Sequence, residues 1–155
     1  MYERELAMRI STKGRYALAA AISMSQQHDK GEYITVLSIS ENLGISKIYL
    51  EQVFSLLKRG GLVISVKGAQ GGYMLSRIPA QITVFEILSA VEGSLFESAE
   101  DTVASFAPGI EKAMRLSVFQ VLDKSVKDTL TAVTLDDLTS EAEKHNADSA
   151  QMFYI

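Results

Sequence analysis

Cysteine is absent from this chain of 155 residues. Without thiols, the sequence excludes disulfides, thiolate-ligated metal clusters and cysteine nucleophiles. Histidine occurs only at His28 and His145, which are far apart in the sequence, so a histidine-built metal site is not expected either. We therefore expect the protein to bind no metal and no cofactor.

Long apolar runs are also missing, although 47% of the residues are apolar, enough to bury a core. No run approaches the roughly 20 residues that cross a membrane, and the charged start MYERELAMR lacks the apolar segment of a secretory signal. We expect a cytoplasmic protein with no membrane partner. Its length fits one domain, or one small domain with an oligomerisation element attached.

The net charge of −4 is the sum of two regions of opposite sign. Residues 8–77 carry nine lysines and arginines against four acidic residues, a balance of +5, whereas residues 78–155 carry five against thirteen, a balance of −8. This asymmetry indicates a basic module that binds a polyanion and an acidic module with another role. Two solvated faces without any partner would give the same counts.

Three helices are predicted in the first 60 residues. Ser11 or Thr12 caps the first, which continues through KGRYALAAAISMSQQ. The second runs from about residue 36 to residue 43 and stops at Gly44, and the third, KIYLEQVFSLLKR, follows its cap Ser46. The apolar spacing of the third helix predicts a buried stripe of Leu50, Val53, Phe54 and Leu57.

A β-hairpin and a fourth helix are predicted next. The segment LVISVKGAQGGYMLS has two runs of β-branched and aromatic residues around a glycine-rich loop, which is typical of a hairpin. Thr83 and Glu86 have the spacing of a capping box, and Ile82 and Ile87 that of a hydrophobic staple. A helix is therefore expected to start there and to run to about Glu92. The stretch from 93 to 109 has no clear period.

A long amphipathic helix is predicted from residue 110 to about 131, in the segment IEKAMRLSVFQVLDKSVKDTLT. At 1.5 Å per residue it is roughly 33 Å long. Because it is apolar on more than one side, we expect a homodimer joined through this helix. Thr134 is expected to cap a short final helix, LDDLTSEAEKH, followed by a flexible polar linker, NADSAQ, and the apolar end MFYI.

Two helices with a turn at Gly44, followed by a hairpin, give the order of a winged helix-turn-helix. The fold class is therefore mainly α with a small β-hairpin wing, plus a long dimerisation helix. In such folds the recognition helix reads bases with its N-terminal half and is surrounded by phosphate-binding groups. The predicted surface for double-stranded DNA contains Lys13, Arg15, Ser46, Lys47, Ile48, Glu51, Gln52, Lys58, Arg59, Lys67, Gln70 and Gly71.

Individual roles follow from side-chain chemistry. A glutamine pairs with adenine and a glutamate accepts from the cytosine amino group, so Gln52 and Glu51 are the candidate base readers. Lys58 and Arg59 are expected to hold the DNA backbone. Lys13 and Arg15 are expected to do so as well, beside the free amide groups that begin the first helix. Lys67 and Gln70 suit a DNA groove, and the wing glycines let the backbone pass close to a duplex.

Four stretches, MRISTKGRYAL, YLEQVFSLLKRGGLV, SVKGAQGGYML and ITVFEILSAVEG, resemble the winged-helix regulators that include the iron–sulfur cluster regulator IscR and the nitric-oxide-sensitive repressor NsrR. The resemblance covers residues 8 to about 93 closely and the long helix more loosely. It implies a homodimer that reads a pseudo-palindromic operator, with the third helix in the major groove and the wing toward the minor groove. It places Glu51 and Gln52 at base-reading positions and Lys67 at a wing position.

The cluster-bearing members carry three cysteines between the fourth helix and the long helix, where this chain has none. No cluster can form here, so another input must control DNA binding. The segments AVTLDDL and MFYI resemble the cysteine-free CymR branch, the cysteine metabolism repressors. That resemblance implies a repressor of cysteine and sulfur metabolism genes whose corepressor is an enzyme, O-acetylserine thiol-lyase (cysteine synthase).

The apolar C-terminus is the expected ligand of that enzyme. The carboxylate of Ile155 is expected to enter its active site, because clustered backbone donors capture terminal carboxylates, while Met152, Phe153 and Tyr154 supply apolar contacts. Two alternatives stay open. The MFYI end packs on its own dimer, or a small metabolite binds between the long helix and the winged domain and is sensed directly.

The chain is thus divided into an N-terminal extension at 1–7, a winged helix-turn-helix domain at 8–93, linker and dimerisation helices at 94–143, and a C-terminal tail at 144–155. No motif clusters a nucleophile, a base and an orienting group. We therefore do not expect an enzyme.

Overall fold

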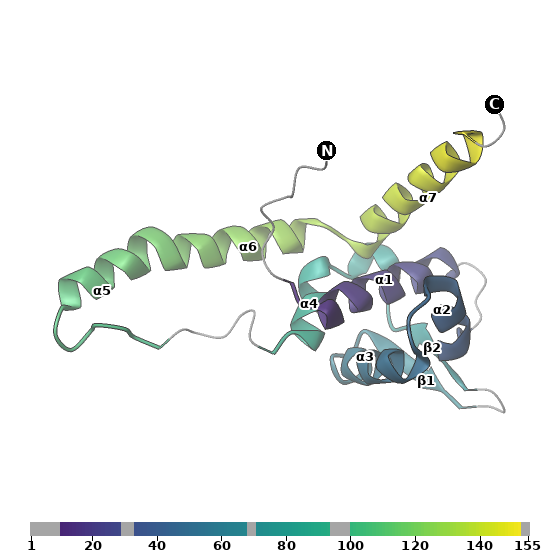
Figure 1. The fold of residues 1–155 in the computed structure, drawn as a ribbon, viewed down its shortest axis with the longest axis horizontal. Helices are drawn as coiled ribbons and strands as arrows, with labels where there is room; N and C mark the ends of the chain where they lie inside the picture. The colour runs from purple at the N-terminus through teal and green to yellow at the C-terminus, as the bar shows by residue number, and fades with distance from the viewer. Residues whose placement is uncertain (1–9, 29–32, 68–70, 94–99, 153–155) are drawn as a thin grey trace.

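A winged helical body and a long helical arm make up the computed structural model, which describes residues 10–28, 33–67, 71–93 and 100–152 (Figure 1). The body contains α1 (Thr12–Gln26), α2 (Val36–Leu43), α3 (Lys47–Arg59), β1 (Val63–Val66), β2 (Gly72–Leu75), η2 (Pro79–Gln81) and α4 (Val84–Val91). The arm contains α5 (Pro108–Met114), the π-helical segment η3 (Arg115–Phe119) and α6 (Gln120–Ala132), and α7 (Leu135–Met152) ends the described chain. The predicted fold class is confirmed.

The predicted helix ends are confirmed by their caps. Ser11 caps α1 by accepting from the Gly14 amide at 3.1 Å, and Ser46 caps α3 by accepting from the Tyr49 amide at 3.2 Å. Gly44 ends α2 in the left-handed conformation at φ 67°, which glycine adopts without a steric penalty. At α4, Thr83 and Glu86 form the complete capping box. Gly44 and Ser46 together fix the turn between α2 and α3.

The wing is the antiparallel pair of β1 and β2, in the register Val63↔Leu75 to Val66↔Gly72. A third backbone segment joins it, because Ile34 and Tyr73 exchange two hydrogen bonds of 2.9 Å each. The approach is so close that a Cβ on Gly72 would lie 2.5 Å from the Tyr33 ring and 2.9 Å from the Ile34 carbonyl oxygen. Only glycine fits there, so the wing is held firmly against the segment that leads into α2.

The other end of the wing is tied to α4. Arg77 donates to the Glu86 carboxylate at 2.9 and 3.3 Å and to the Gln81 carbonyl oxygen at 2.8 Å. Burial alone would raise the pKa of Glu86, but the Arg77 guanidinium and the Thr83 amide outweigh it and hold the pKa below its ordinary value. The carboxylate therefore stays ionised at neutral pH.

The core of the body lies between α1, α3, α4 and the wing, and the predicted stripe of α3 is buried in it. The base of α7 belongs to this core as well, because Leu135 is 0% exposed. Backbone hydrogen bonds run from Val84 to the Val133 carbonyl oxygen at 2.9 Å and from Leu135 to the Ile82 carbonyl oxygen at 2.8 Å. The chain thus leaves the body after α4, forms the arm, and returns to the body at residue 133.

The arm is one continuous helix from 108 to 132, slightly longer than predicted and roughly 37 Å in length. Its outer end is secured by Glu111, whose carboxylate accepts from the Thr102 and Val103 amides at 3.0 Å each. These donations, with the Val103 amide as the largest contributor, hold the pKa of Glu111 below its ordinary value. Its inner end packs on the body, where Lys127 lies 5.6 Å from the centre of the Phe85 ring.

The predicted linker NADSAQ is wrong, because α7 continues as a helix to Met152. The segment contains no glycine or proline, and its two alanines favour helix, so its polarity marks an exposed helix rather than a flexible coil. Residues 153–155, which complete the predicted partner-binding end, lie outside the described residues. Within the described ranges, no helix has both the length and the apolar character needed to cross a membrane.

Candidate nucleic-acid interface

The outer face of α3 carries most of the predicted DNA-binding residues. Lys47, Glu51, Gln52, Lys58 and Arg59 are all exposed, opposite the fully buried stripe of the same helix. Ile48 on this face is 74% exposed, so an apolar side chain is available there beside the polar ones. The arrangement leaves a polar, partly basic helix face free to enter a groove.

A shallow hollow of about 460 Å³ lies on this face; we call it the reading hollow. It brings Lys13 of α1 together with the N-terminal half of α3, and its lining residues are Lys13, Ile48, Glu51, Gln52, Ser55 and Leu56. A cation from a different helix therefore sits beside both candidate base readers. This grouping agrees with a phosphate contact next to a base-reading surface, although the two parts are 35 or more residues apart in sequence.

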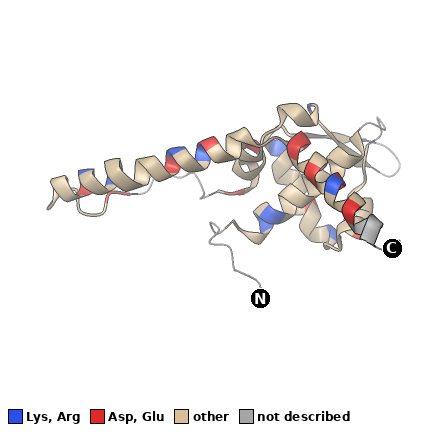
Figure 2. Ribbon diagram, turned by 90° about the horizontal axis from the view of Figure 1, so that it is seen from above, with Lys and Arg blue, Asp and Glu red and all other residues tan. Residues whose placement is uncertain are grey.

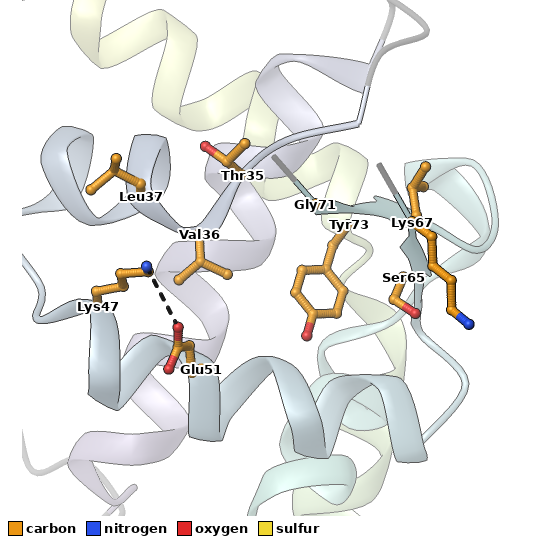
Figure 3. Close-up of a pocket in the computed structure, with 11 residues that line it drawn as sticks. Thr35, Val36, Leu37, Lys47, Glu51, Ser65, Lys67, Gly71 and Tyr73 are labelled. Atoms are coloured by element: carbon orange, nitrogen blue, oxygen red, sulfur yellow. Dashed lines mark ion pairs between the residues drawn. The ribbon is translucent and has the colours of Figure 1, made fainter. Parts of the chain in front are cut away.

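A larger hollow of about 910 Å³ lies between the start of α2, the start of α3 and the wing; we call it the wing hollow (Figure 3). Its lining residues are Thr35, Val36, Leu37, Lys47, Glu51, Ser65, Val66, Lys67, Gly71, Gly72 and Tyr73. Four predicted residues meet here, namely Lys47, Glu51, Lys67 and Gly71. The sequence analysis did not single out Tyr73, Ser65 or Thr35, which supply hydroxyl groups to the same hollow.

Glu51 borders both hollows and pairs with Lys47, whose Nζ lies 3.9 Å from Glu51 Oε1. Both side chains are more than half exposed. An exposed pair at this distance contributes little to stability, so water, a base or a phosphate replaces it at low cost. The pair therefore places one acceptor and one cation at the N-terminal end of α3, and both stay available to a ligand.

The other predicted residues fall into three groups. Lys58 and Arg59 lie in the last turn of α3, roughly 16 Å along the helix from Lys47, and are exposed. Arg15 is exposed on α1, and the Ser46 hydroxyl is engaged in capping α3. Gln70 lies outside the described residues.

The start of α1 is less open than we expected. Glu92 Oε1 accepts from the Ser11 amide at 3.1 Å and from the Ser11 hydroxyl, and that hydroxyl accepts from the Gly14 amide. A Cβ on Gly14 would lie 2.4 Å from Glu92 Oε1. A carboxylate from the end of α4 thus already occupies this helix end, so Lys13 and Arg15 are the groups there that remain for a phosphate.

A second surface of the chain is the apolar side of the arm. Six large apolar residues between 110 and 122 are 45–60% exposed: Ile110, Leu116, Val118, Phe119, Val121 and Leu122. Figure 1 shows that the arm extends away from the body, so the body does not cover them. In Figure 2 the ribbon of the arm carries both basic (blue) and acidic (red) residues, and that of α7 carries mainly acidic ones. The two hollows described above lie on the α3 face and not between arm and body.

Comparison with known proteins agrees with this architecture. A sequence model of the Rrf2 family, described as iron-dependent transcriptional regulators, matches residues 10–141. The HTH-type transcriptional regulator CymR of Bacillus subtilis is 38% identical over 150 residues, which cover 96% of this chain and 100% of that protein. The HTH-type transcriptional regulator IscR of Pectobacterium atrosepticum is 34% identical over 144 residues, covering 93% of this chain and 87% of that one.

Solved structures give the same result. IscR of T. potens superposes with a TM-score of 0.69 at 35% identity, over 90% of this chain and 92% of that one. CymR of B. subtilis, titled the global cysteine regulator, superposes with a TM-score of 0.67 at 34% identity, over 87% and 98%. The resemblance to IscR and CymR is confirmed, and so is the expectation of a regulator rather than an enzyme, because these relatives are named transcriptional regulators. The chain belongs to the Rrf2 family of transcriptional regulators.

Proposed function

We propose that the protein is a homodimeric repressor that binds a pseudo-palindromic operator in double-stranded DNA, with α3 in the major groove and the wing toward the minor groove. The observation that carries the proposal is the exposed face of α3, which has a hollow on each side and lysines from α1, α3 and the wing around it. The target genes belong to cysteine and sulfur metabolism, and the site of action is the cytoplasm. The similarity to CymR supports both assignments.

Within this site, Glu51 and Gln52 read base edges, and Ile48 makes an apolar contact in the groove. Lys13, Arg15, Lys58 and Arg59 bind backbone phosphates on the two sides of α3. Lys47 contacts the DNA where α3 enters the major groove. Lys67, Gln70 and Gly71 contact it from the wing. All of these that the structure describes are exposed or partly exposed. Ser46 is exposed as well, and its contribution is to fix the start of α3 by capping it.

Titration of duplex DNA at several salt concentrations tests the proposal. Because lysines and arginines release counterions from phosphates, we expect the logarithm of the affinity to fall linearly with the logarithm of the salt concentration. We also expect a chosen operator to bind more tightly than unrelated duplex at every salt concentration. Affinity that does not depend on salt would contradict the phosphate contacts, and equal affinity for all sequences would contradict the base-reading role of α3.

The dimer is supported by the arm. Exposed contiguous apolar surface on a soluble protein generally marks an interaction site, and a helix of this length without cover from its own body needs a partner. A two-fold dimer through 110–131 would cover these side chains and place two copies of α3 for two half-sites. One helical turn or a multiple of it then separates the half-sites.

Iron, which the family description names, does not fit the residues of this chain. An iron–sulfur cluster requires thiolate ligands, and the sequence has no cysteine. Among the residues that the structure describes, no group of three or more histidine, aspartate or glutamate side chains is placed to hold a metal ion. We therefore place the regulatory input elsewhere.

The proposed input is O-acetylserine thiol-lyase, which binds the C-terminal residues and acts as corepressor. Figure 1 shows α7 pointing away from the body, so residues 146–151 are part of a helix and not the flexible linker we predicted. Ile155 supplies the carboxylate, and Met152, Phe153 and Tyr154 supply apolar contacts. Met152 at the end of this polar helix and the three apolar or aromatic residues that follow it in the sequence support this role.

Calorimetry with the isolated peptide QMFYI and the enzyme tests this mechanism without the rest of the chain. We expect binding, and we expect O-acetylserine to weaken it because both occupy the same active site. By thermodynamic reciprocity, the bound regulator weakens the hold of the enzyme on O-acetylserine by the same factor.

Deleting Ile155 from the full chain is the matched test. The deletion should abolish the complex with the enzyme and leave the dimer and its intrinsic DNA binding intact. If the deletion instead destabilises the free dimer and the peptide gives no heat of binding, the C-terminal residues pack on their own dimer. The input to the repressor then lies elsewhere.

A further inference from the structure

The hydroxyl group of Tyr73 in the wing hollow has no role in the assignments above. Tyr73 lies on β2, and its side chain extends into the hollow between Val36 and Ser65 (Figure 3). Among the described residues, the hydroxyl has no hydrogen-bond partner. Phenylalanine would pack equally well at this position, so the phenol group supplies a polar atom that the fold itself does not use.

Tyr73 is held in place through both its ring and its backbone. Its ring stacks on Phe54, with ring centres 4.8 Å apart and planes at 25°, and Phe54 is fully buried in α3. Its backbone exchanges two hydrogen bonds of 2.9 Å with Ile34, just before α2. The hydroxyl is therefore oriented before any ligand arrives, and little conformational entropy is lost when it donates a hydrogen bond.

Two further groups share this face of the wing. Ser65 is the register partner of Tyr73 across the hairpin, so both side chains lie on the same face of the two-stranded sheet. Lys67 follows Ser65 by two residues and also lines the hollow. The opposite wall carries Lys47 of α3. Two hydroxyl donors thus lie between two cations, and Glu51 in the same hollow is paired with only one of them, Lys47. Because that pair is exposed and weak, the hydroxyls and lysines together suit an oxyanion.

The proposed placement of α3 and the wing determines what passes through the hollow. A helix in the major groove and a wing toward the adjacent minor groove are separated by one sugar–phosphate strand of the duplex. The hollow is the space between these two elements, so a phosphodiester of that strand must lie in it. Two lysines and one glutamate line the hollow, a balance of +1 that matches the single negative charge of a phosphodiester.

We propose that the wing hollow binds one backbone phosphate of each half-site and that the Tyr73 hydroxyl donates a hydrogen bond to it, with Ser65 and Lys67 beside it. This inference rests on the proposed DNA-binding function and adds a contact to it. Because the donor is neutral and the acceptor is a phosphate, the contact strengthens binding to every sequence and releases no counterion. The lack of sequence preference distinguishes the Tyr73 contact from those of the base readers. The unchanged salt dependence distinguishes it from those of the lysines.

Tyr73→Phe in the full-length protein removes the hydroxyl and keeps the ring that stacks on Phe54. We expect the affinity for operator and for unrelated duplex to fall by the same factor, about tenfold for a hydrogen bond to a charged group, with an unchanged salt slope. Tyr33→Phe is the matched control, because Tyr33 lies outside the lining of the hollow, and it should bind as the parent does. Lys67→Ala should lower the salt slope by about one for each subunit of the dimer.

Operator duplexes with a neutral methylphosphonate at one position at a time locate the phosphate. At one position in each half-site the parent should lose more affinity than Tyr73→Phe does, because the variant has only its lysine contact to lose there, while both proteins respond alike at all other positions. Equal affinity of Tyr73→Phe and the parent, or equal losses at every position, would overturn the proposed contact and leave the DNA-binding function standing. Failure of the parent to bind any duplex would overturn both.

Discussion

Replacing Val118 and Leu122 with glutamate is expected to give a monomer of 17.0 kDa in place of a dimer of twice that mass. The two residues flank the middle of the arm and are 52% and 54% exposed. Pairing of two arms would bury them, and a pair of unpaired buried carboxylates is strongly unfavourable. Because both side chains are exposed in the single chain, the body should keep its fold. Light scattering at micromolar concentration measures the mass.

The same double variant should lose most of its operator affinity. A dimer that binds two half-sites at once gains roughly 10²- to 10⁴-fold over one half-site alone, and a monomer gives up that gain. Gln120→Glu, also on the arm and also exposed, adds a carboxylate at a polar position and serves as the control. A double variant that remains a dimer, or that binds operator as tightly as the parent, would show that this stretch of the arm does not join the subunits.

Replacing Gln52 with alanine is expected to change which sequence the protein prefers. An amide that pairs with a base edge contributes about 1 to 3 kcal/mol of discrimination at one base pair, so the preference there should relax. Lys58→Ala is the contrasting variant, since Lys58 lies on the same helix two turns further on and is proposed to bind phosphate. It should weaken binding to all sequences alike and lower the salt slope by about one unit for each subunit of the dimer.

Competition between single-base operator variants measures this difference for each protein. If Gln52→Ala ranks the operator variants in the same order and with the same ratios as the parent, Gln52 does not read a base. If Lys58→Ala alters the ranking instead, the proposed division of roles along α3 is reversed.

The features that could be predicted from the sequence are those set by neighbouring residues. The caps Ser11 and Ser46, the turn at Gly44 and the capping box from Thr83 to Glu86 all depend on groups within three or four residues of each other. The apolar period of α3 also fixed which of its faces is exposed. For the same reason, most of the candidate DNA-binding residues could be named in advance.

Long-range contacts could not be predicted in this way. Ser11 and Glu92 are 81 residues apart. No local signal in the sequence indicates that the Glu92 carboxylate accepts hydrogen bonds at the start of α1, the helix that Ser11 caps. Leu135 returns to the core after the whole arm, which places the base of α7 in the body. The wing hollow combines three separate segments, so the sequence alone did not predict that Tyr73 lines it. The register of the hairpin, which the structure supplies, places Tyr73 opposite Ser65.

Polarity misled us at the C-terminus. Residues 146–151 contain alanine, glutamine and aspartate without glycine or proline, a composition that fits a solvated helix as well as a coil. The ion pair of Glu141 with His145, at 2.9 Å on the preceding turns, adds i,i+4 support when the imidazole is protonated. The operator symmetry and the corepressor followed from family resemblance and not from any pattern in the residues.

Selection of bound duplexes from a random library by the protein, followed by sequencing, is the most direct test of a dimer that reads DNA with two copies of α3. We expect an enriched pseudo-palindrome whose two half-site centres lie about 10 to 10.5 base pairs apart, or a multiple of that distance. Enrichment of a single unsymmetric site, or no enrichment above the starting library, would contradict a dimer that reads DNA with two copies of α3.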